Sequence, residues 1–182
     1  MSQRGQMPRD TRAVTSAEQA GGDYRVGVGY DSHRFAPGRA LILGGVRIKS
    51  DVGLVGHSDA DAVCHAITDA VLGAAGLGDI GEMFPDTDPA NKDRDSIQML
   101  EAAVKRISGA GFLVRNVDVS VIAEAPRLSP ERDRIRTRLA SALGVDSSAV
   151  SVKGKTNEGM GWIGRGEGLA CIAVATLVGK GK

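Results

Sequence analysis

The interior of this chain has to be built almost without aromatic side chains. Aromatic residues make up only 3% of the 182, whereas 42% are hydrophobic and 25 are glycine. Ala, Val, Leu and Ile must therefore fill the core, and the glycines allow many tight turns. A folded region of about 150 residues buries roughly 70% of its unfolded surface, which is enough for one independent domain.

Hydrophobic periodicity indicates a mixture of strands and helices. Alternating apolar residues predict four sheet strands: 25–30, 114–123, 150–155 and 169–178. The first strand should end in a loop at Asp31-Ser32-His33, and Gly44-Gly45 between two short apolar runs predicts a hairpin. Helices are expected at 59–75 with Ser58 as the N-cap, at 95–109 and at 129–144. We expect an α+β domain with a mixed four-stranded sheet and helices packed on one face.

Bulk properties argue against several kinds of partner. The formal net charge is +1, so neither nucleic acid nor a membrane surface is an expected partner. No apolar run reaches the ~20 residues that a membrane helix needs. Cys64 and Cys171 form no CxxC pair and predict two reduced, buried thiols in a cytoplasmic protein.

The N-terminal residues 1–23 contain no apolar signal region. We interpret them as a disordered extension that precedes a domain spanning 24–182. Their arginines leave plastid-type targeting open, although Asp10, Glu18 and Asp23 argue against it.

The three histidines, His33, His57 and His65, fall within one segment of 33 residues. Residues i and i+2 of a strand point to one face, so Asp31 and His33 should lie together at a strand end. With His65 on the following helix they form a plausible three-ligand zinc set that leaves a fourth position open for substrate. The alternative is that each histidine is an independent surface or core residue.

Two further features adjoin these histidines. Asp61, His65 and Asp69 recur at helical spacing, so a carboxylate could orient His65; the alternative is a solvated acidic stripe. His57 and Ser58 immediately precede the predicted helix, where free backbone N–H groups favour an anion. Capping alone would explain Ser58 but does not require His57.

Two polar loops complete the candidate site. The loop from Asp79 to Asp88 is rich in carboxylates and backbone donors, although it could be an ordinary turn-rich loop. Lys155 and Thr156 offer a cation and a hydroxyl suited to a phosphate, and Glu158 offers a carboxylate suited to a magnesium-type ion. The spacing before Lys155 is not that of a Walker P-loop, and a charged, glycine-rich strand edge is the alternative.

These residues occur in motifs that resemble the 2-C-methyl-D-erythritol 2,4-cyclodiphosphate synthase family of non-mevalonate isoprenoid biosynthesis. The resemblance extends from about Arg25 to Thr176. Its most specific motifs are Gly29-Tyr-Asp-Ser-His33, Gly56-His-Ser-Asp-Ala-Asp61 with His65, Leu77-Gly-Asp-Ile-Gly81, Phe84-Pro-Asp-Thr-Asp-Pro89, Asn116-Val-Asp118 and Gly164-Arg-Gly-Glu-Gly168. Each motif is weak alone, but their order and spacing together are specific.

The resemblance implies a metal-dependent lyase that releases CMP from 4-diphosphocytidyl-2-C-methyl-D-erythritol 2-phosphate. Asp31, His33 and His65 would hold Zn²⁺, while Glu158 would help to hold Mg²⁺ or Mn²⁺ between the α and β phosphates. The 2-phosphate would attack the β phosphorus, and His57 and Thr156 would stabilise the transition state. The other implied substrate contacts, with the erythritol at 79–88 and the cytosine at 123–129, are Ser32, Ser58, Asp79, Ile80, Gly81, Phe84, Pro85, Asp86, Thr87, Asp88, Ala123, Glu124, Ala125, Pro126, Arg127, Leu128, Ser129, Lys155, Asn157, Trp162 and Arg165, together with Asp31 and His33.

The family also implies a homotrimer assembled around the sheets, with each site between neighbouring subunits. Arg165 and Glu167 would lie near the three-fold axis, beside a central cavity that can hold an isoprenoid diphosphate. The chain departs from the usual residues of the family at five positions, none of them a zinc ligand: Ala60, Arg127, Lys155, Asn157 and Trp162.

Two other functions fit the same residues. A zinc hydrolase could use the same three ligands and a metal-bound water, and its product would be an open chain. A non-catalytic trimer that binds isoprenoid phosphates would keep its biological role after His57→Ala. Because the chain retains every expected ligand, the synthase is the favoured hypothesis.

Overall fold

The computed structural model describes residues 23–181. The predicted extension 1–23 therefore lies outside the described residues, apart from Asp23. The strands are β1 (Tyr24–Pro37), β2 (Leu41–Leu43), β3 (Val46–Ile48), β4 (Val52–Leu54), β5 (Phe112–Ile122), β6 (Val150–Lys155) and β7 (Gly168–Gly179). The helices are α1 (Ala62–Ala75), α2 (Ile80–Met83), α3 (Ser96–Gly109), α4 (Arg132–Leu143) and α5 (Gly161–Gly164), with 3-10 turns η2 (Pro89–Asn91) and η3 (Ser147–Ala149). Within residues 23–181, no helix is long and apolar enough to span a membrane.

Five strands form one mixed sheet in the order β4-β1-β7-β5-β6, and β2 pairs with β3 as the predicted hairpin. β5 and β6 run parallel, and the other neighbours are antiparallel. The prediction of an α+β domain with a mixed sheet is confirmed, but the prediction of four strands is wrong. The additional strand is β4, which pairs with the last three residues of β1 and is too short to show a periodic pattern.

The first strand is longer than the sequence predicts. The expected loop at Asp31-Ser32-His33 is absent, because pairing between β1 and β7 continues past these residues. Asp31 and His33 therefore lie inside a strand, on the same side as the buried Gly27 and Gly29.

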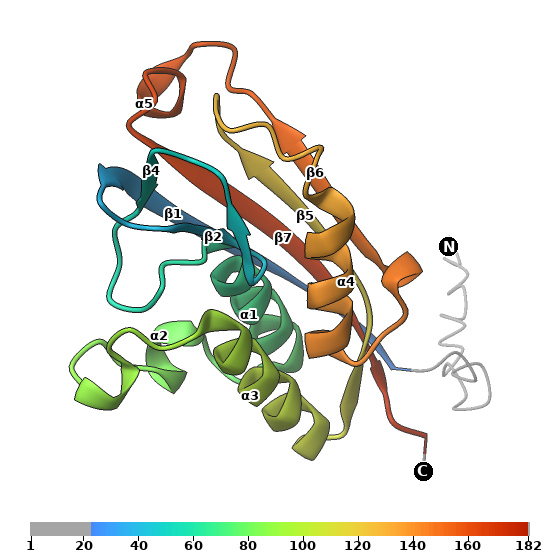
Figure 1. Cartoon of the computed structure of the whole chain (residues 1–182). Helices are drawn as coiled ribbons and strands as arrows, with labels where there is room; N and C mark the ends of the chain where they lie inside the picture. The colour runs from blue at the N-terminus through green and yellow to red at the C-terminus, as the bar shows by residue number, and fades with distance from the viewer. Residues whose placement is uncertain (1–22, 182) are drawn as a thin grey trace, which may run out of the picture.

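Helices α1, α3 and α4 cover one face of the sheet (Figure 1). Aliphatic side chains fill the space between the two layers, as the composition requires: Ile67, Leu100, Leu139, Val119 and Leu177 are fully buried. The other face carries apolar side chains of β1 and β7 that are 37–66% exposed: Tyr24, Val26, Val28, Tyr30, Ile172 and Val174. We call these six residues the open face.

Helix α1 begins three residues later than predicted, because Asp61 rather than Ser58 is its N-cap. The Asp61 carboxylate accepts hydrogen bonds from the backbone N–H groups of Val63 and Cys64, both at 3.1 Å. Ala60 has a left-handed backbone with a φ of 59°, which a helix starting before it could not contain. Helix α4 likewise begins at Arg132, a few residues after its predicted start.

Strand β1 and helix α1 approach each other closely at two glycines. A Cβ atom at Gly29 would overlap the carbonyl oxygen of Ala66, and one at Gly27 would overlap that of Ala70. Glycine is needed at both positions, and the close approach brings the helix that bears His65 directly over the strand.

We expect Gly29→Ala to destabilise the protein by about 3 kcal/mol, because the added methyl group forces the backbone of α1 away from β1. Gly73→Ala, on the same helix, is the matched control, since its added Cβ atom has nothing within 4 Å. The control should stabilise the protein by up to about 1 kcal/mol. Urea unfolding measures both changes, and equal stabilities would contradict the close contact.

Candidate active site

Asp31, His33 and His65 converge where β1 passes under the first turn of α1. Asp31 Oδ2 lies 2.9 Å from His33 Nε2 and 3.0 Å from His65 Nδ1, and the two nitrogens are 3.3 Å apart. The three ligand atoms all lie within 4.8 Å of one another. One carboxylate and two imidazoles are a donor set that zinc accepts, and three protein ligands leave a position open for a substrate atom. The predicted grouping of these residues as a possible metal site is confirmed.

In each imidazole, the ring nitrogen that does not face Asp31, which we call the outer nitrogen, has a protein partner. His33 Nδ1 lies 2.7 Å from the carbonyl oxygen of Val55, which can only accept. Nδ1 is therefore the donor, and in the neutral ring, the form that binds a metal, Nε2 presents its lone pair to the cluster. His65 Nε2 lies 2.9 Å from Ser96 Oγ and 3.1 Å from Ser58 Oγ. Partners of this kind orient the rings of metal-binding histidines.

The cluster favours an ionised carboxylate. Burial alone raises the pKa of Asp31, but its close contacts with the imidazoles of His33 and His65 outweigh burial and hold this pKa well below its usual range. Burial alone lowers the pKa of His33, but its hydrogen bond with Asp31 and the negative charge there raise it overall. An ionised Asp31 is the form that binds a cation.

The two carboxylates of the predicted acidic stripe, Asp61 and Asp69, have structural partners. Asp61 is fully buried and accepts hydrogen bonds from both glycines of the β2–β3 turn, at 2.8 and 2.6 Å. Its carboxylate therefore fixes the hairpin to α1, and the interpretation that it orients His65 is wrong. Asp69 accepts a hydrogen bond from the backbone N–H of Ile80 at 2.8 Å, so it anchors the start of α2 and is not part of a solvated stripe.

A pocket of about 360 Å³ contains Asp31, His33 and His65, which we call the metal cluster because they could hold a metal ion. The predicted site residues in its wall are Asp31, His33, His57, Ser58, His65, Ile80, Gly81, Phe84 and Asp86. The sequence predicts that His57 and Ser58 lie at a helix N-terminus. This prediction is wrong, because α1 begins only at Ala62. Four predicted residues do not line this pocket: Asp79 and Asp88, which cap α2 and η2, and Pro85 and Thr87.

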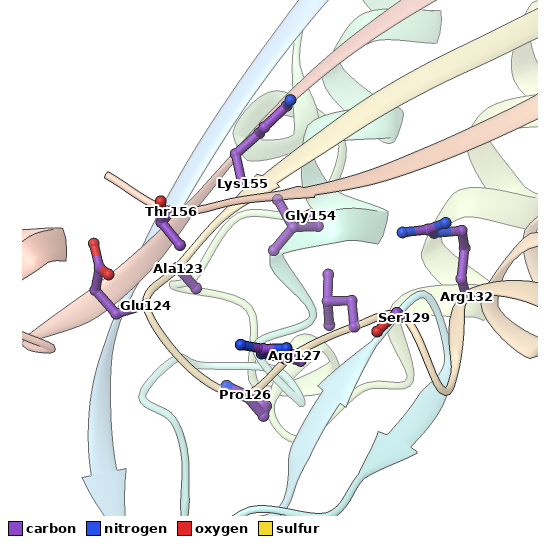
Figure 2. A pocket seen from close by; sticks show the side chains of 11 residues that line it. Ala123, Glu124, Pro126, Arg127, Ser129, Arg132, Gly154, Lys155 and Thr156 are labelled. Carbon is purple, nitrogen blue, oxygen red and sulfur yellow. The ribbon is translucent and has the colours of Figure 1, made fainter. Parts of the chain in front are cut away.

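A second pocket lies at the ends of β5 and β6 (Figure 2). The predicted residues in its wall are Ala123, Glu124, Pro126, Arg127, Leu128, Ser129, Lys155 and Thr156, whereas Ala125 is not part of it. The side chain of Lys155 points to the opposite side of β6 from Arg127 (Figure 2). A Cβ atom at the neighbouring Gly154 would face Leu128 in the wall of the pocket. Successive side chains of a strand point to opposite faces, so the side chain of Lys155 points to the other face.

The turn after β6 is held by its own polar side chains. Glu124 Oε1 accepts hydrogen bonds from the backbone N–H groups of Asn157, at 2.9 Å, and Gly159, at 3.2 Å. The Thr156 hydroxyl donates to Glu158 Oε1 at 2.7 Å. A hydroxyl and a carboxylate therefore lie together on an exposed turn, where both are accessible to a ligand.

The remaining predicted residues lie apart from both pockets. Ser32 and Trp162 line another pocket, together with His33, Arg34 and Glu167. Arg165 Nε lies 2.6 Å from Glu167 Oε1 in an exposed ion pair. The first two pockets share no lining residue, so one chain does not unite the metal cluster and the second pocket in a single cavity.

Sequence reasoning missed three polar residues of the site: Asn91 in the wall of the first pocket, Ser96 and Arg132. Ser96 contacts His65, but its position directly after the N-cap Asp95 is typical of an ordinary helix start. Arg132 lines the second pocket, but it belongs to a helix with four arginines, and nothing in the sequence distinguishes it.

The fold agrees with comparisons to known proteins. The model of the YgbB family matches residues 24–178. The 2-C-methyl-D-erythritol 2,4-cyclodiphosphate synthase of Gemmatimonas aurantiaca is 63% identical over 157 residues, which are 86% of this chain and 95% of that protein. The enzyme of the same name from Burkholderia cenocepacia is 53% identical over 159 residues, which are 87% of this chain and 99% of that protein.

Solved structures give the same result. IspF from Plasmodium falciparum in complex with CDP is 37% identical, with a TM-score of 0.77 and coverage of 87% of this chain and 97% of that one. The bifunctional IspDF from Campylobacter jejuni is 40% identical, with a TM-score of 0.84 and coverage of 87% of this chain and 43% of that one. A CDP-bound 2C-methyl-D-erythritol-2,4-cyclodiphosphate synthase is 37% identical, with a TM-score of 0.78 and coverage of 84% of this chain and 99% of that one.

Proposed function

The chain belongs to the YgbB family and catalyses the formation of 2-C-methyl-D-erythritol 2,4-cyclodiphosphate in non-mevalonate isoprenoid biosynthesis, and we propose that Asp31, His33 and His65 are the centre of this reaction. The observation that carries the proposal is the convergence of their three ligand atoms in a pocket that also contains His57. The proposed substrate is 4-diphosphocytidyl-2-C-methyl-D-erythritol 2-phosphate. The CDP complexes of two similar proteins support a substrate that contains cytidine diphosphate.

In the proposed reaction, an oxygen of the substrate's 2-phosphate forms a bond to the β phosphorus. The bond from that phosphorus to the oxygen that bridges it to the α phosphorus breaks, and CMP leaves with this oxygen. No protein nucleophile is required. The protein therefore has to orient the two reacting phosphates and neutralise their charge.

We assign Asp31, His33 and His65 to Zn²⁺, because one carboxylate and two imidazoles match the ligand preferences of zinc. When bound, the ion supplies Lewis-acid neutralisation of a phosphate oxygen. We assign Glu158 to Mg²⁺ or Mn²⁺, since a carboxylate on an exposed turn can hold such an ion together with substrate phosphates.

The polar residues around the cluster are assigned to different parts of the substrate. His57 and Ser58 share the pocket of the metal cluster and are assigned to the reacting phosphates. Residues 79–88 are assigned to the erythritol, and residues 123–129 to the cytosine, whose edge would be recognised by backbone groups. Because the Lys155 side chain extends on the opposite side of β6 from Arg127, we assign it to the rim of the second pocket.

We further propose that the protein is a homotrimer with its sites between subunits. Exposed apolar residues on the open face support an interface there, since a patch of this kind is typical of protein–protein contacts. Because the two pockets share no lining residue, the second pocket of one subunit would complete the metal pocket of its neighbour. Arg165 would lie near the three-fold axis, beside a central cavity for an isoprenoid diphosphate. Residues 24–182 would form this synthase domain, and residues 1–23 an extension of it.

A phosphorus NMR assay of the purified protein with the diphosphocytidyl substrate, magnesium and zinc tests the proposal. We expect a cyclic diphosphate and CMP in equal amounts. An open-chain product would identify a zinc hydrolase instead. No reaction by a zinc-loaded trimer would favour a protein that only binds isoprenoid phosphates.

Thr156→Ala is expected to lower turnover by about 10²-fold or more, as the loss of one transition-state hydrogen-bond donor commonly does. Zinc content should stay at the wild-type level, because Thr156 lies outside the metal cluster. Thr156→Ser retains the hydroxyl and should keep most of the activity. Wild-type turnover in Thr156→Ala would rule out the assigned role.

A further inference from the structure

The outer nitrogen of His65 faces a hydroxyl whose proton is already used. Ser96 is fully buried at the start of α3, and its Oγ lies 2.9 Å from His65 Nε2. The same hydroxyl donates to Asp59 Oδ1, and the backbone N–H of Ser96 donates to Asp59 Oδ2 at 3.1 Å. A serine hydroxyl has one proton and two acceptor lone pairs. Toward His65, Ser96 can therefore only accept a hydrogen bond.

This arrangement determines which nitrogen of His65 carries the proton. Nε2 must donate to Ser96, with the Ser58 hydroxyl as a second neighbour at 3.1 Å. Nδ1 is then left with its lone pair, and Nδ1 is the atom that lies 3.0 Å from Asp31 Oδ2. The two histidines of the cluster thus present opposite nitrogens: Nε2 from His33 and Nδ1 from His65.

We propose that Asp59 and Ser96 form a positioning relay that fixes the tautomer and ring orientation of His65 and thereby sets the affinity of the metal site. The relay acts through His65 and touches neither the metal nor the substrate. Outer partners of metal-binding histidines commonly change affinity by ten- to a hundredfold. This inference rests on the metal site proposed above.

Backbone hydrogen bonds hold the relay in place from two sides. The Asp59 N–H donates to the Arg94 carbonyl at 3.2 Å, and the Asp93 N–H donates to the His57 carbonyl at 2.9 Å. Asp59 Oδ1 also accepts a hydrogen bond from the Asp61 N–H at 3.2 Å. The segment that contains His57 is thus fixed to the start of α3, and the carboxylate has little freedom to leave Ser96.

Ser96→Ala tests the relay directly. Competition with a chromogenic chelator should show zinc binding weakened by about ten- to a hundredfold, because Nε2 loses its fixed acceptor. Ser96→Thr keeps the hydroxyl and should recover most of the affinity. Ser108→Ala is the matched control on the same helix, since the Ser108 hydroxyl contacts Lys180 at the opposite end of α3. Circular dichroism before zinc addition establishes that each variant is folded.

A double-mutant cycle with Asp59→Asn separates a relay from two independent effects. Asp59→Asn should weaken zinc binding less than Ser96→Ala, and the double variant should bind as Ser96→Ala does, because both residues act through one hydrogen bond. Nitrogen NMR of the zinc-loaded wild type should show His65 protonated at Nε2 and metal-bound at Nδ1. Wild-type affinity in folded Ser96→Ala, additive effects in the cycle, or the opposite tautomer would each overturn the relay. Failure of the wild type to bind zinc would overturn the metal site itself, and the relay with it.

Discussion

Asp31→Ala is expected to lose its zinc and its turnover together, with the rate falling by at least about 10³-fold. Asp31 is the centre of the proposed ligand set, because one of its oxygens lies within 3.0 Å of a nitrogen of His33 and a nitrogen of His65. Its removal leaves the two imidazoles without the negative charge that attracts the cation. A metal ion contributes several kcal/mol of charge stabilisation to phosphoryl transfer, and about 1.4 kcal/mol corresponds to a tenfold change in rate. Elemental analysis by mass spectrometry and the phosphorus NMR assay measure the two losses.

The matched control for this variant is Asp133→Ala, which removes a carboxylate that is 91% exposed on α4. It should keep its zinc and its turnover. His65→Ala should behave as Asp31→Ala does, because it removes a second ligand of the same cluster. A zinc-free Asp31→Ala with full activity would show that the cluster is not the reaction centre.

The metal cluster could be predicted because it depends on short-range patterns. Asp31 and His33 are two positions apart, and the period of a strand places them on one face whether the strand ends there or continues. His65 follows on the only long helix of that segment, and few other histidines compete for the role. The mistaken loop at residues 31–33 therefore did not affect the predicted ligand set.

The features that could not be predicted depend on contacts between distant parts of the chain. Asp61 caps α1 while it also binds the hairpin turn 16 and 17 residues earlier, and this second contact leaves no local pattern. Ser96 reaches His65 from 31 residues away, and Asp59 reaches Ser96 from 37. Strand β4 exists only because the end of β1 extends beyond β7 and offers it an edge.

The open face makes Val28→Asp the second variant with a large expected effect. Val28 lies in the middle of β1, opposite Val174 of β7, and both side chains are exposed on the open face. In a symmetric trimer each substitution occurs three times, and an unpaired carboxylate buried at an interface costs several kcal/mol. We expect monomers, together with turnover reduced by about 10³-fold or more, since a monomer would not hold both ends of the substrate in the reacting geometry.

Zinc binding by Val28→Asp should remain at the wild-type level, because Asp31 and His33 lie on the helix-covered side of β1 and Val28 on the other. This combination of retained metal and lost turnover separates an assembly defect from damage to the cluster. Thr137→Asp, on the exposed side of α4, introduces the same charge away from the open face and should remain trimeric and active. Sedimentation velocity measures the oligomeric state. A trimeric Val28→Asp would show that the open face is not the interface, and a fully active monomer would show that one chain contains the whole site.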